Sequence, residues 1–188
     1  MEKVLVIVGP TGVGKTSLSI ELAKAYSGEI ISGDSMQVYR EMSIGTAKIK
    51  ESEKQAIPHY LVDEFHFDEE YNVKIFQERS RKYIKEICER KHLPIICGGT
   101  GLYIKSTLYD YEFLDQEDLS FLHFLQARSN DELWCLLKTV DPKACDNLHP
   151  NNRQRLIRAL SMAHAGKKKS SIIETQQHQP IYDAYIIG

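Results

Sequence analysis

The sequence predicts a three-layer α/β domain with a parallel sheet, together with a helical segment. Two observations lead to this prediction. Short apolar runs alternate with segments of helical spacing over residues 1–110, which is typical of parallel strands joined by helices. From about Asp110 to residue 165, helix signals continue without a good strand. A chain of 188 residues suits one domain with room for a small subdomain.

Five segments are expected to form strands. Most are rich in Val and Ile, and several stop at glycine or proline, which suits buried strands of a parallel sheet. In chain order they are Val4–Val8, Ile30–Ile31, Tyr60–Val62, Leu93–Cys97 and Ile181–Ile187.

Two helices are expected between these strands. Apolar residues recur at helical spacing over Thr16–Tyr26. Asn72 is a candidate N-cap for a long helix that runs to about Arg90. Its inward face is expected to carry Val73, Phe76, Ile84 and Ile87.

The later part of the chain is expected to be helical. Asn130–Lys138 and Asn152–Ala163 have helical character, and Gly166 is placed as a C-terminal stop. Asp141 followed by Pro142 predicts a helix start, with Asp141 as the N-cap and Pro142 in the first turn. The polar stretch 167–179 reads as a loop.

Composition narrows the class of protein. Hydrophobic residues make up 42% and charged residues 27%, which argues against a disordered chain. No apolar run approaches the ~20 residues that cross a bilayer, and the start does not resemble a signal peptide. The four cysteines lack CxxC spacing and are expected to be reduced thiols, which predicts a cytoplasmic protein.

The net charge of −2 conceals an asymmetry. Residues 1–141 carry 17 basic and 23 acidic side chains, whereas residues 142–188 carry 7 basic and 3 acidic ones. A basic C-terminal part points weakly to a polyanionic partner, whereas charge alone favours a solvated helix face.

The most specific motif follows the first expected strand. It matches GxxxxGK[ST] between a strand and a helix, which is the context of a phosphate-binding P-loop. In such a loop, backbone amides and a helix N-terminus converge on phosphate oxygens, the lysine adds a charge, and the threonine hydroxyl ligates Mg²⁺. The motif consists of Gly9, Pro10, Thr11, Gly12, Val13, Gly14, Lys15 and Thr16. The fold expected is therefore P-loop NTPase-like, with Thr16 as the metal ligand.

Two aspartates are candidates for a catalytic carboxylate. Asp34 follows Ile30–Ile31, and Asp63 follows Leu61–Val62. Ligands of open α/β sheets bind at the carboxyl ends of strands, which favours a functional role. A lone aspartate after a strand is also a common cap or turn residue.

Two further features admit a functional and a structural explanation. The first is the glycine turn Gly98–Gly101, which would expose amides and the Thr100 hydroxyl to a ligand. A plain strand-to-helix connection explains the same residues equally well. The second is the pair Arg155 and Arg158, which share a helix face near Arg153. They would either bind RNA phosphate or a diphosphate, or simply form a solvated helix face.

Several short sequence motifs together resemble those of the tRNA dimethylallyltransferase family, whose members are also called tRNA isopentenyltransferases or IPP transferases. They occur in family order over residues 4–164. Besides the P-loop they are Ile31–Arg40, Ile44–Lys48, Pro58–Asp63, Gly98–Tyr103 and His149–Leu160.

This resemblance implies an activity and its partners. Members transfer a dimethylallyl group from dimethylallyl diphosphate to N6 of adenosine-37 next to the tRNA anticodon. The P-loop then binds the prenyl diphosphate, and Lys15, Thr16 and Mg²⁺ neutralise the leaving group. A monomer without membrane attachment is expected.

The resemblance also implies residue roles. Asp34 is the expected general base, and Thr100 and Lys15 join it in the catalytic set. The base is flipped out to reach them. The expected tRNA contacts are Asp34, Ser35, Met36, Gln37, Thr100, Gln154, Arg155, Leu156, Ile157 and Arg158.

The chain departs from the family pattern in three places. Tyr60 stands where the family has a second histidine. The segment between Tyr111 and Asn130 is shorter than the usual helical insertion, and the family chain continues past the equivalent of Gly188. We therefore expect a fragment, with residues 1–110 as P-loop core, 111–150 as a partial helical insertion and 151–188 as a return to the core.

Three alternatives remain open from the sequence. They are an adenylate isopentenyltransferase, a P-loop small-molecule kinase and a non-catalytic P-loop binding fragment. The basic tail and the cluster Arg153–Arg158 favour RNA as acceptor.

Overall fold

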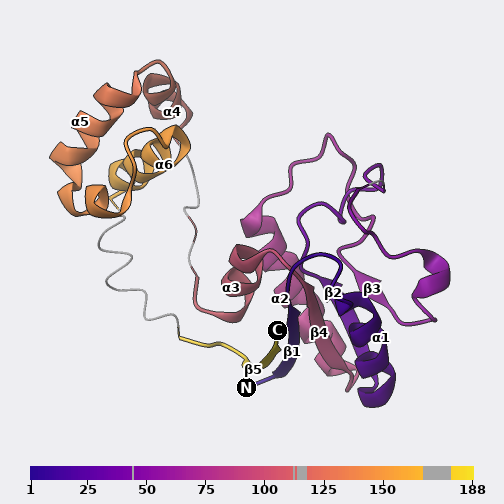
Figure 1. Cartoon of the computed structure of the whole chain (residues 1–188). Helices are drawn as coiled ribbons and strands as arrows, with labels where there is room; N and C mark the ends of the chain where they lie inside the picture. Colours follow the sequence, from indigo (N-terminus) through magenta and orange to yellow (C-terminus); the bar gives the residue numbers. More distant parts are fainter. Residues whose placement is uncertain (44, 112, 114–117, 167–178) are drawn as a thin grey trace. The chain divides into compact units, whose positions relative to one another are not determined.

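The computed structural model describes residues 1–43, 45–111, 113, 118–166 and 179–188 (Figure 1). The chain forms two compact units, which are residues 1–111 with 178–188 and residues 112–177. The expected loop at 167–179 falls outside the described residues apart from Gln179. Within the described ranges, no helix is long and apolar enough to cross a membrane.

The first unit contains a five-stranded parallel sheet in the order β3-β2-β4-β1-β5. The strands are β1 (Lys3–Val8), β2 (Gly28–Ser32), β3 (His59–Tyr60), β4 (Leu93–Gly98) and β5 (Asp183–Ile187). Four of the five expected strands agree closely with these bounds. Because every pairing is parallel, all strands end at the same edge of the sheet.

Helices cover both faces of this sheet (Figure 1). They are α1 (Lys15–Tyr26), α2 (Val73–Glu89) and α3 (Gly101–Leu108), with a short 3-10 turn η1 (Glu51–Glu53). Successive strand residues point to opposite faces, so Val4 and Val6 pack toward α2 and α3, whereas Leu5 and Ile7 pack toward α1. The three-layer α/β prediction is confirmed.

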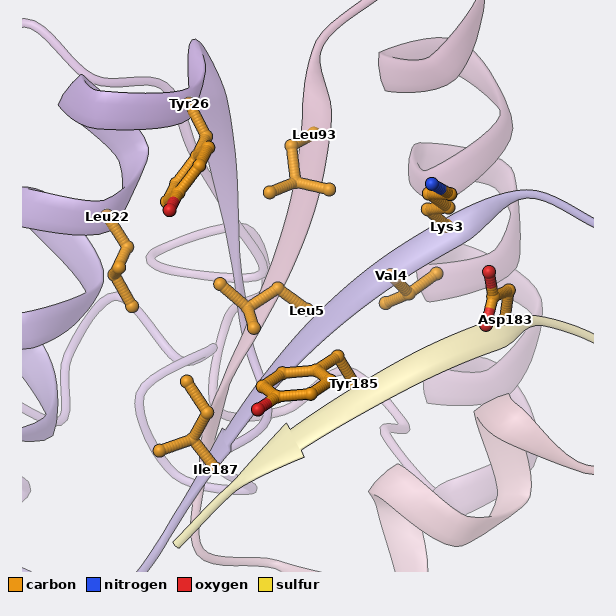
Figure 2. Close-up of a pocket in the computed structure, with 9 residues that line it drawn as sticks. All are labelled: Lys3, Val4, Leu5, Leu22, Tyr26, Leu93, Asp183, Tyr185 and Ile187. Carbon is orange, nitrogen blue, oxygen red and sulfur yellow. The ribbon is translucent and has the colours of Figure 1, made fainter.

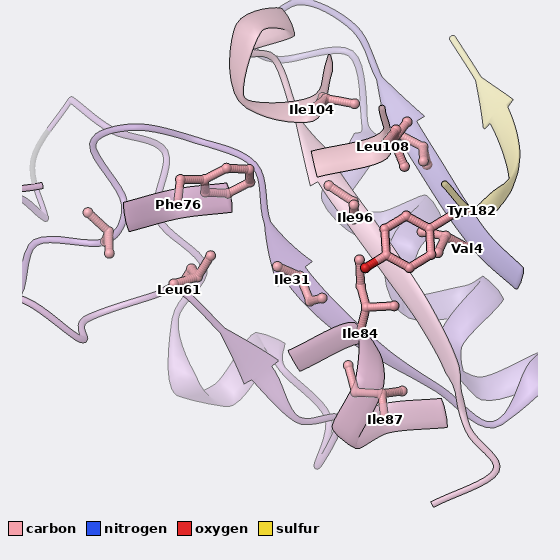
Figure 3. Close-up of a cluster of buried hydrophobic side chains, with 12 residues drawn as sticks. Val4, Ile31, Leu61, Phe76, Ile84, Ile87, Ile96, Ile104, Leu108 and Tyr182 are labelled. Atoms are coloured by element: carbon pink, nitrogen blue, oxygen red, sulfur yellow. The ribbon is translucent and has the colours of Figure 1, made fainter. Parts of the chain in front are cut away.

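The larger core cluster lies between the sheet and α2 with α3 (Figure 3). Phe76, Ile84 and Ile87 of α2 are fully buried there, as expected, and each contributes roughly 1.5–3 kcal/mol relative to an exposed position. The Asn72 side chain caps α2 by accepting hydrogen bonds from the amides of Lys74 and Ile75.

The expected strand at Tyr60–Val62 is wrong in its extent. β3 ends at Tyr60, and Leu61 then adopts a positive φ of 59° that a strand does not allow. Leu61 and Val62 are nevertheless buried. Their apolar character therefore reflects burial in a turn and not an extended backbone.

The second unit is helical, as the sequence predicts. It contains α4 (Leu119–Gln126), α5 (Asn130–Val140), the 3-10 turn η2 (Pro142–Asn147) and α6 (Arg153–His164). Asp141 caps η2, Pro142 occupies its first turn, and Gly166 follows α6 with a φ of 76°. α4 lies in the part of the chain expected to be helical, although it was not predicted as a separate helix.

The second unit differs from expectation at one boundary. Residues from 151 onward were expected to return to the P-loop core, but α6 packs with α4 and α5. Leu156, Ala159 and Leu160 of α6 share a buried cluster with Leu133 and Leu137 of α5. An amphipathic helix pattern predicts that a face is buried, but not against which partner.

Candidate functional site

The P-loop joins β1 to α1. Gly12 and Gly14 adopt positive φ angles of 86° and 91°, and nothing lies within 4 Å of a Cβ atom placed on either. Glycine is therefore required here by backbone conformation and not by space. Gly14 occupies the N-cap of α1 without a capping side chain, so it leaves the first amides of α1 to an external acceptor. Such a helix start favours an anion.

Lys15 and Thr16 begin α1 at this loop. The Lys15 Nζ atom donates a hydrogen bond to the Pro10 carbonyl oxygen at 2.6 Å, which folds the ammonium back over the loop. The exposed Thr16 hydroxyl makes no hydrogen bond with any residue that the structure describes. Thr16 also borders a cleft of about 570 Å³ between α1 and the segment 47–55. The motif is thus arranged as a phosphate-binding loop.

Glycine backbones bring three strand ends together. The Gly33 amide donates to the Cys97 carbonyl at 2.9 Å, and the Thr100 amide donates to the Gly33 carbonyl at 3.3 Å. A Cβ atom on Gly98 would lie 2.4 Å from the Gly33 carbonyl carbon, and one on Gly99 would lie 3.2 Å from the Gly9 carbonyl oxygen. Only glycine allows the Gly98 approach. The loops after β1, β2 and β4 therefore meet at one edge, with the P-loop, Asp34 and Thr100 on them.

Asp34 is half-buried in the turn after β2. Its Oδ1 atom accepts hydrogen bonds from the amides of Met36 at 2.8 Å and Gln37 at 3.3 Å. Its Oδ2 atom has no hydrogen-bond partner among the described residues. One oxygen is thus used to orient the carboxylate, while the other remains able to accept a proton.

The residues that follow Asp34 differ in how far their side chains are exposed to a ligand. Met36 is exposed and Ser35 is half-buried. The Gln37 side chain is engaged within the protein, since its Nε2 atom donates to the Thr46 carbonyl at 3.1 Å and its Oε1 atom accepts from the Ser32 hydroxyl. Thr100 occupies the N-cap of α3 without a side-chain capping bond.

Tyr103 lies one turn after Thr100. Burial raises the pKa of its phenol, and the charges of Tyr39 and Asp34 raise it further. The ring stacks on Phe76 with centroids 4.6 Å apart. Tyr103 is therefore held at the start of α3 by its packing on Phe76.

Asp63, the other candidate carboxylate, is paired. Its Oδ1 atom accepts a hydrogen bond from the Lys48 Nζ atom at 2.6 Å. Asp63 also has a positive φ of 57° in the turn after β3. An ammonium therefore already neutralises this carboxylate, whereas no cation contacts Asp34 among the described residues.

The predicted RNA-binding segment of α6 has two faces. Gln154, Arg155 and Arg158 are exposed. Leu156 is fully buried and Ile157 is half-buried in the helical core, so the side chain of Leu156 is not presented to solvent.

Arg153 has a structural position instead. Its guanidinium donates to the carbonyl oxygens of Gln126 and Arg128, both at 2.7 Å, and to the Asn130 side chain at 3.1 Å. It fastens α6 to the connection between α4 and α5. The sequence alone left Arg153 in the same cluster as the two exposed arginines.

A second hollow lies elsewhere on the sheet. It has a volume of about 370 Å³, and Leu22 and Tyr26 of α1 face Leu5, Tyr185 and Ile187 across it (Figure 2). None of the residues predicted from the sequence to bind or react lines this groove. The carboxyl edge of the sheet is therefore the candidate site.

The model of the IPP transferase family matches residues 37–188 of this chain. The chain belongs to that family. Two of its similar relatives are the tRNA dimethylallyltransferases of Bacillus cereus and Bacillus anthracis, each 51% identical over 193 residues. The matches cover 100% of this chain and 61% and 62% of the respective relatives. The chain thus spans less than two thirds of the length of these relatives.

Solved structures of IPP transferase family members agree with this assignment. One is a eukaryotic dimethylallyltransferase described as acting on tRNA, with a TM-score of 0.90 and 33% identity over 99% of this chain and 48% of its own. Another is the tRNA isopentenylpyrophosphate transferase of Staphylococcus epidermidis, with a TM-score of 0.64 and 45% identity over 100% of this chain and 63% of its own. The P-loop NTPase-like fold predicted from the sequence is confirmed.

Sequence reasoning assigned no role to Lys48, although Lys48 closes one of the quoted family phrases. Its buried ammonium and its contact with Asp63 were not predicted. The signal that could have found it is a lysine in an otherwise small and apolar phrase, Ile44–Lys48, placed shortly after Asp34.

Proposed function

We propose that the protein transfers a dimethylallyl group from dimethylallyl diphosphate to N6 of the adenosine next to a tRNA anticodon. The observation that carries the proposal is the position of Asp34, whose carboxylate lies on a loop that meets the P-loop edge through glycine contacts. Membership of the IPP transferase family and the names of the relatives support it. We expect a monomer acting in the cytoplasm.

The reaction needs a base and a stabilised leaving group. The N6 nitrogen attacks C1 of the dimethylallyl group, and the bond from C1 to the diphosphate oxygen breaks with its electron pair going to the diphosphate. Asp34 takes the N6 proton. The amides of the P-loop and the Lys15 ammonium stabilise the charge that develops on the diphosphate.

The P-loop residues fit Mg²⁺ bound together with a diphosphate. In the described part of the chain no three His, Cys, Asp or Glu residues form a ready metal cluster, and Mg²⁺ commonly binds few protein ligands plus phosphate oxygens and water. Thr16 would supply the protein ligand. When bound, the ion adds positive charge beside the leaving diphosphate.

The RNA contacts divide between the units. Asp34, Ser35, Met36 and Thr100 would meet the adenosine, which has to leave its stack to reach a partly buried carboxylate. Gln154, Arg155 and Arg158 would contact the backbone, because guanidinium groups pair well with phosphate.

Incubation with labelled dimethylallyl diphosphate and either tRNA or AMP tests the proposal. We expect label in tRNA and none in AMP. Label in AMP would indicate an adenylate isopentenyltransferase, and phosphoryl transfer from ATP without prenyl transfer would indicate a kinase. Binding of the diphosphate without transfer to any acceptor would indicate a binding module.

Binding of the prenyl diphosphate can be tested separately by calorimetry. Lys15→Ala removes a charged donor of the loop, and loss of such a bond costs about 1.5–3 kcal/mol, or roughly ten- to hundredfold in affinity. Lys24→Ala, in an exposed ion pair in the last turn of α1, should bind like the unaltered protein. If the Lys15 variant and the unaltered protein bind dimethylallyl diphosphate with equal affinity, Lys15 does not contribute to the diphosphate site.

A further inference from the structure

Lys48 is a buried ammonium outside the groups that touch the reacting atoms. Its side chain is 5% exposed, and its Nζ atom donates to the Tyr39 carbonyl oxygen and to Asp63 Oδ1, both at 2.6 Å. Lysine is almost never buried unless it is paired. These two acceptors belong to different segments, so one ammonium ties Tyr39 to Asp63.

The Tyr39 segment is the continuation of the Asp34 turn. The amides of Met36 and Gln37 bind the Asp34 carboxylate, and the Tyr39 amide donates to the Met36 carbonyl at 3.3 Å. Tyr39 is therefore linked through the Met36 carbonyl to the backbone whose amides orient Asp34.

The Asp63 segment pairs with the same turn. The Asp63 amide donates to the Gln37 carbonyl at 3.2 Å, and the Glu64 amide donates to the Val38 carbonyl at 2.9 Å. The Arg40 Nε atom donates to the Asp63 carbonyl at 3.0 Å. Val38 is fully buried and shares the larger core cluster with Leu61. The Lys48 side chain thus closes a set of backbone contacts between two loops.

The backbone of this region is strained. Ala47, Leu61 and Asp63 are non-glycine residues with positive φ angles of 48°, 59° and 57°. Such conformations persist only where surrounding contacts enforce them. Lys48 directly follows Ala47 in the chain and binds Asp63, so its side chain links the two strained stretches.

We infer that Lys48 is a positioning residue that holds the Asp34 turn in its reactive geometry by pairing with Asp63 and the Tyr39 carbonyl. The inference rests on the proposed function for its effect on rate, but not for its effect on structure. A displacement of about 1 Å in a reactive group can cost on the order of 100-fold in rate.

Lys48→Met tests the inference, because it keeps an unbranched apolar side chain and removes the ammonium. Hydrogen exchange should become about tenfold or more faster at the Met36 and Gln37 amides, since local opening sets exchange rates. Exchange in β1 and β4 should be unchanged, which shows that the fold is retained. The value of kcat should fall roughly ten- to hundredfold while KM for dimethylallyl diphosphate changes little.

Two further variants make the test specific. Asp63→Asn removes the negative charge but keeps an acceptor, so it should show the same changes in smaller size even if the Lys48 variant folds poorly. Lys24→Met removes an exposed lysine of an ion pair and should change neither exchange nor kcat.

Unchanged exchange at Met36 and Gln37 would overturn the inference. Faster exchange with an unchanged kcat would also overturn it, because Asp34 would then not need to be held. If the unaltered protein transfers no prenyl group, the proposed function fails, while the exchange rates still decide whether Lys48 holds the turn.

Discussion

At the scale of single residues, the two candidate aspartates are distinguished by their partners. Asp34 has two backbone amides on one oxygen, whereas Asp63 has an ammonium. Backbone amides orient a carboxylate without supplying a full opposing charge. Asp34 is therefore the better placed of the two to accept a proton from a substrate.

Asp34→Asn should lower single-turnover prenyl transfer to tRNA by about 10²–10⁴-fold, which is the usual contribution of a general base. The asparagine Oδ1 atom can still accept from the Met36 and Gln37 amides, so the turn and tRNA affinity should be retained. Asp68→Asn, at an exposed position, is the matched control. A variant as fast as the unaltered protein would exclude Asp34 as the base.

At the scale of elements, α6 has two faces of different character. Its inner face packs in the helical unit through Leu156 and Leu160, and Arg153 binds three acceptors of the α4–α5 connection. Its outer face presents Arg155 and Arg158. Three arginines within six residues thus differ in their surroundings.

Replacing Arg155 and Arg158 together by alanine should weaken tRNA binding and flatten its salt dependence, because fewer counterions are released. Stability should change by less than about 0.5 kcal/mol for each exposed arginine. Arg153→Ala should instead destabilise the helical unit by about 1–3 kcal/mol. Filter binding across salt concentrations and urea unfolding measure both effects. If the salt dependence of tRNA affinity is unchanged in the double variant, Arg155 and Arg158 form a solvated face that does not contact tRNA.

At the scale of the whole sheet, the two edges differ in character. The carboxyl edge carries the P-loop and Asp34, while Glu29 is buried near the amino edge at the start of β2. The Glu29 carboxylate accepts hydrogen bonds from Arg90, His92 and the Tyr60 hydroxyl, which joins β2, β3 and the segment before β4. Charges at this edge therefore stabilise the fold.

Glu29 should make stability depend on acid pH. Burial alone raises the pKa of its carboxyl, but hydrogen bonds from Arg90, Tyr60 and His92 outweigh burial and lower it from 4.5 to about 2. A lowered pKa in the folded state stabilises the protein above pH 4.5, and this contribution is lost as pH falls toward 2.

Glu29→Gln should therefore reduce the free energy of unfolding at neutral pH and flatten its decrease between pH 4.5 and 2. Urea unfolding at several pH values measures this. Glu21→Gln, at an exposed position in α1, should keep the original pH dependence. Parallel curves for the Glu29 variant and the unaltered protein would contradict the prediction.

The sequence by itself determined the features that depend on neighbours in the chain. The P-loop motif, the Asn72 cap and the buried face of α2 follow from residues within a few positions of one another, because turns, caps and helical periodicity are local. Only the tertiary structure decided the remainder. Lys48 meets Asp63 across fifteen residues, Gly33 meets Gly98 across two different strand ends, and α6 packs with the helical unit. These contacts depend on how the elements are brought together, since residue type and spacing indicate which groups become buried or charged but not which partner they meet.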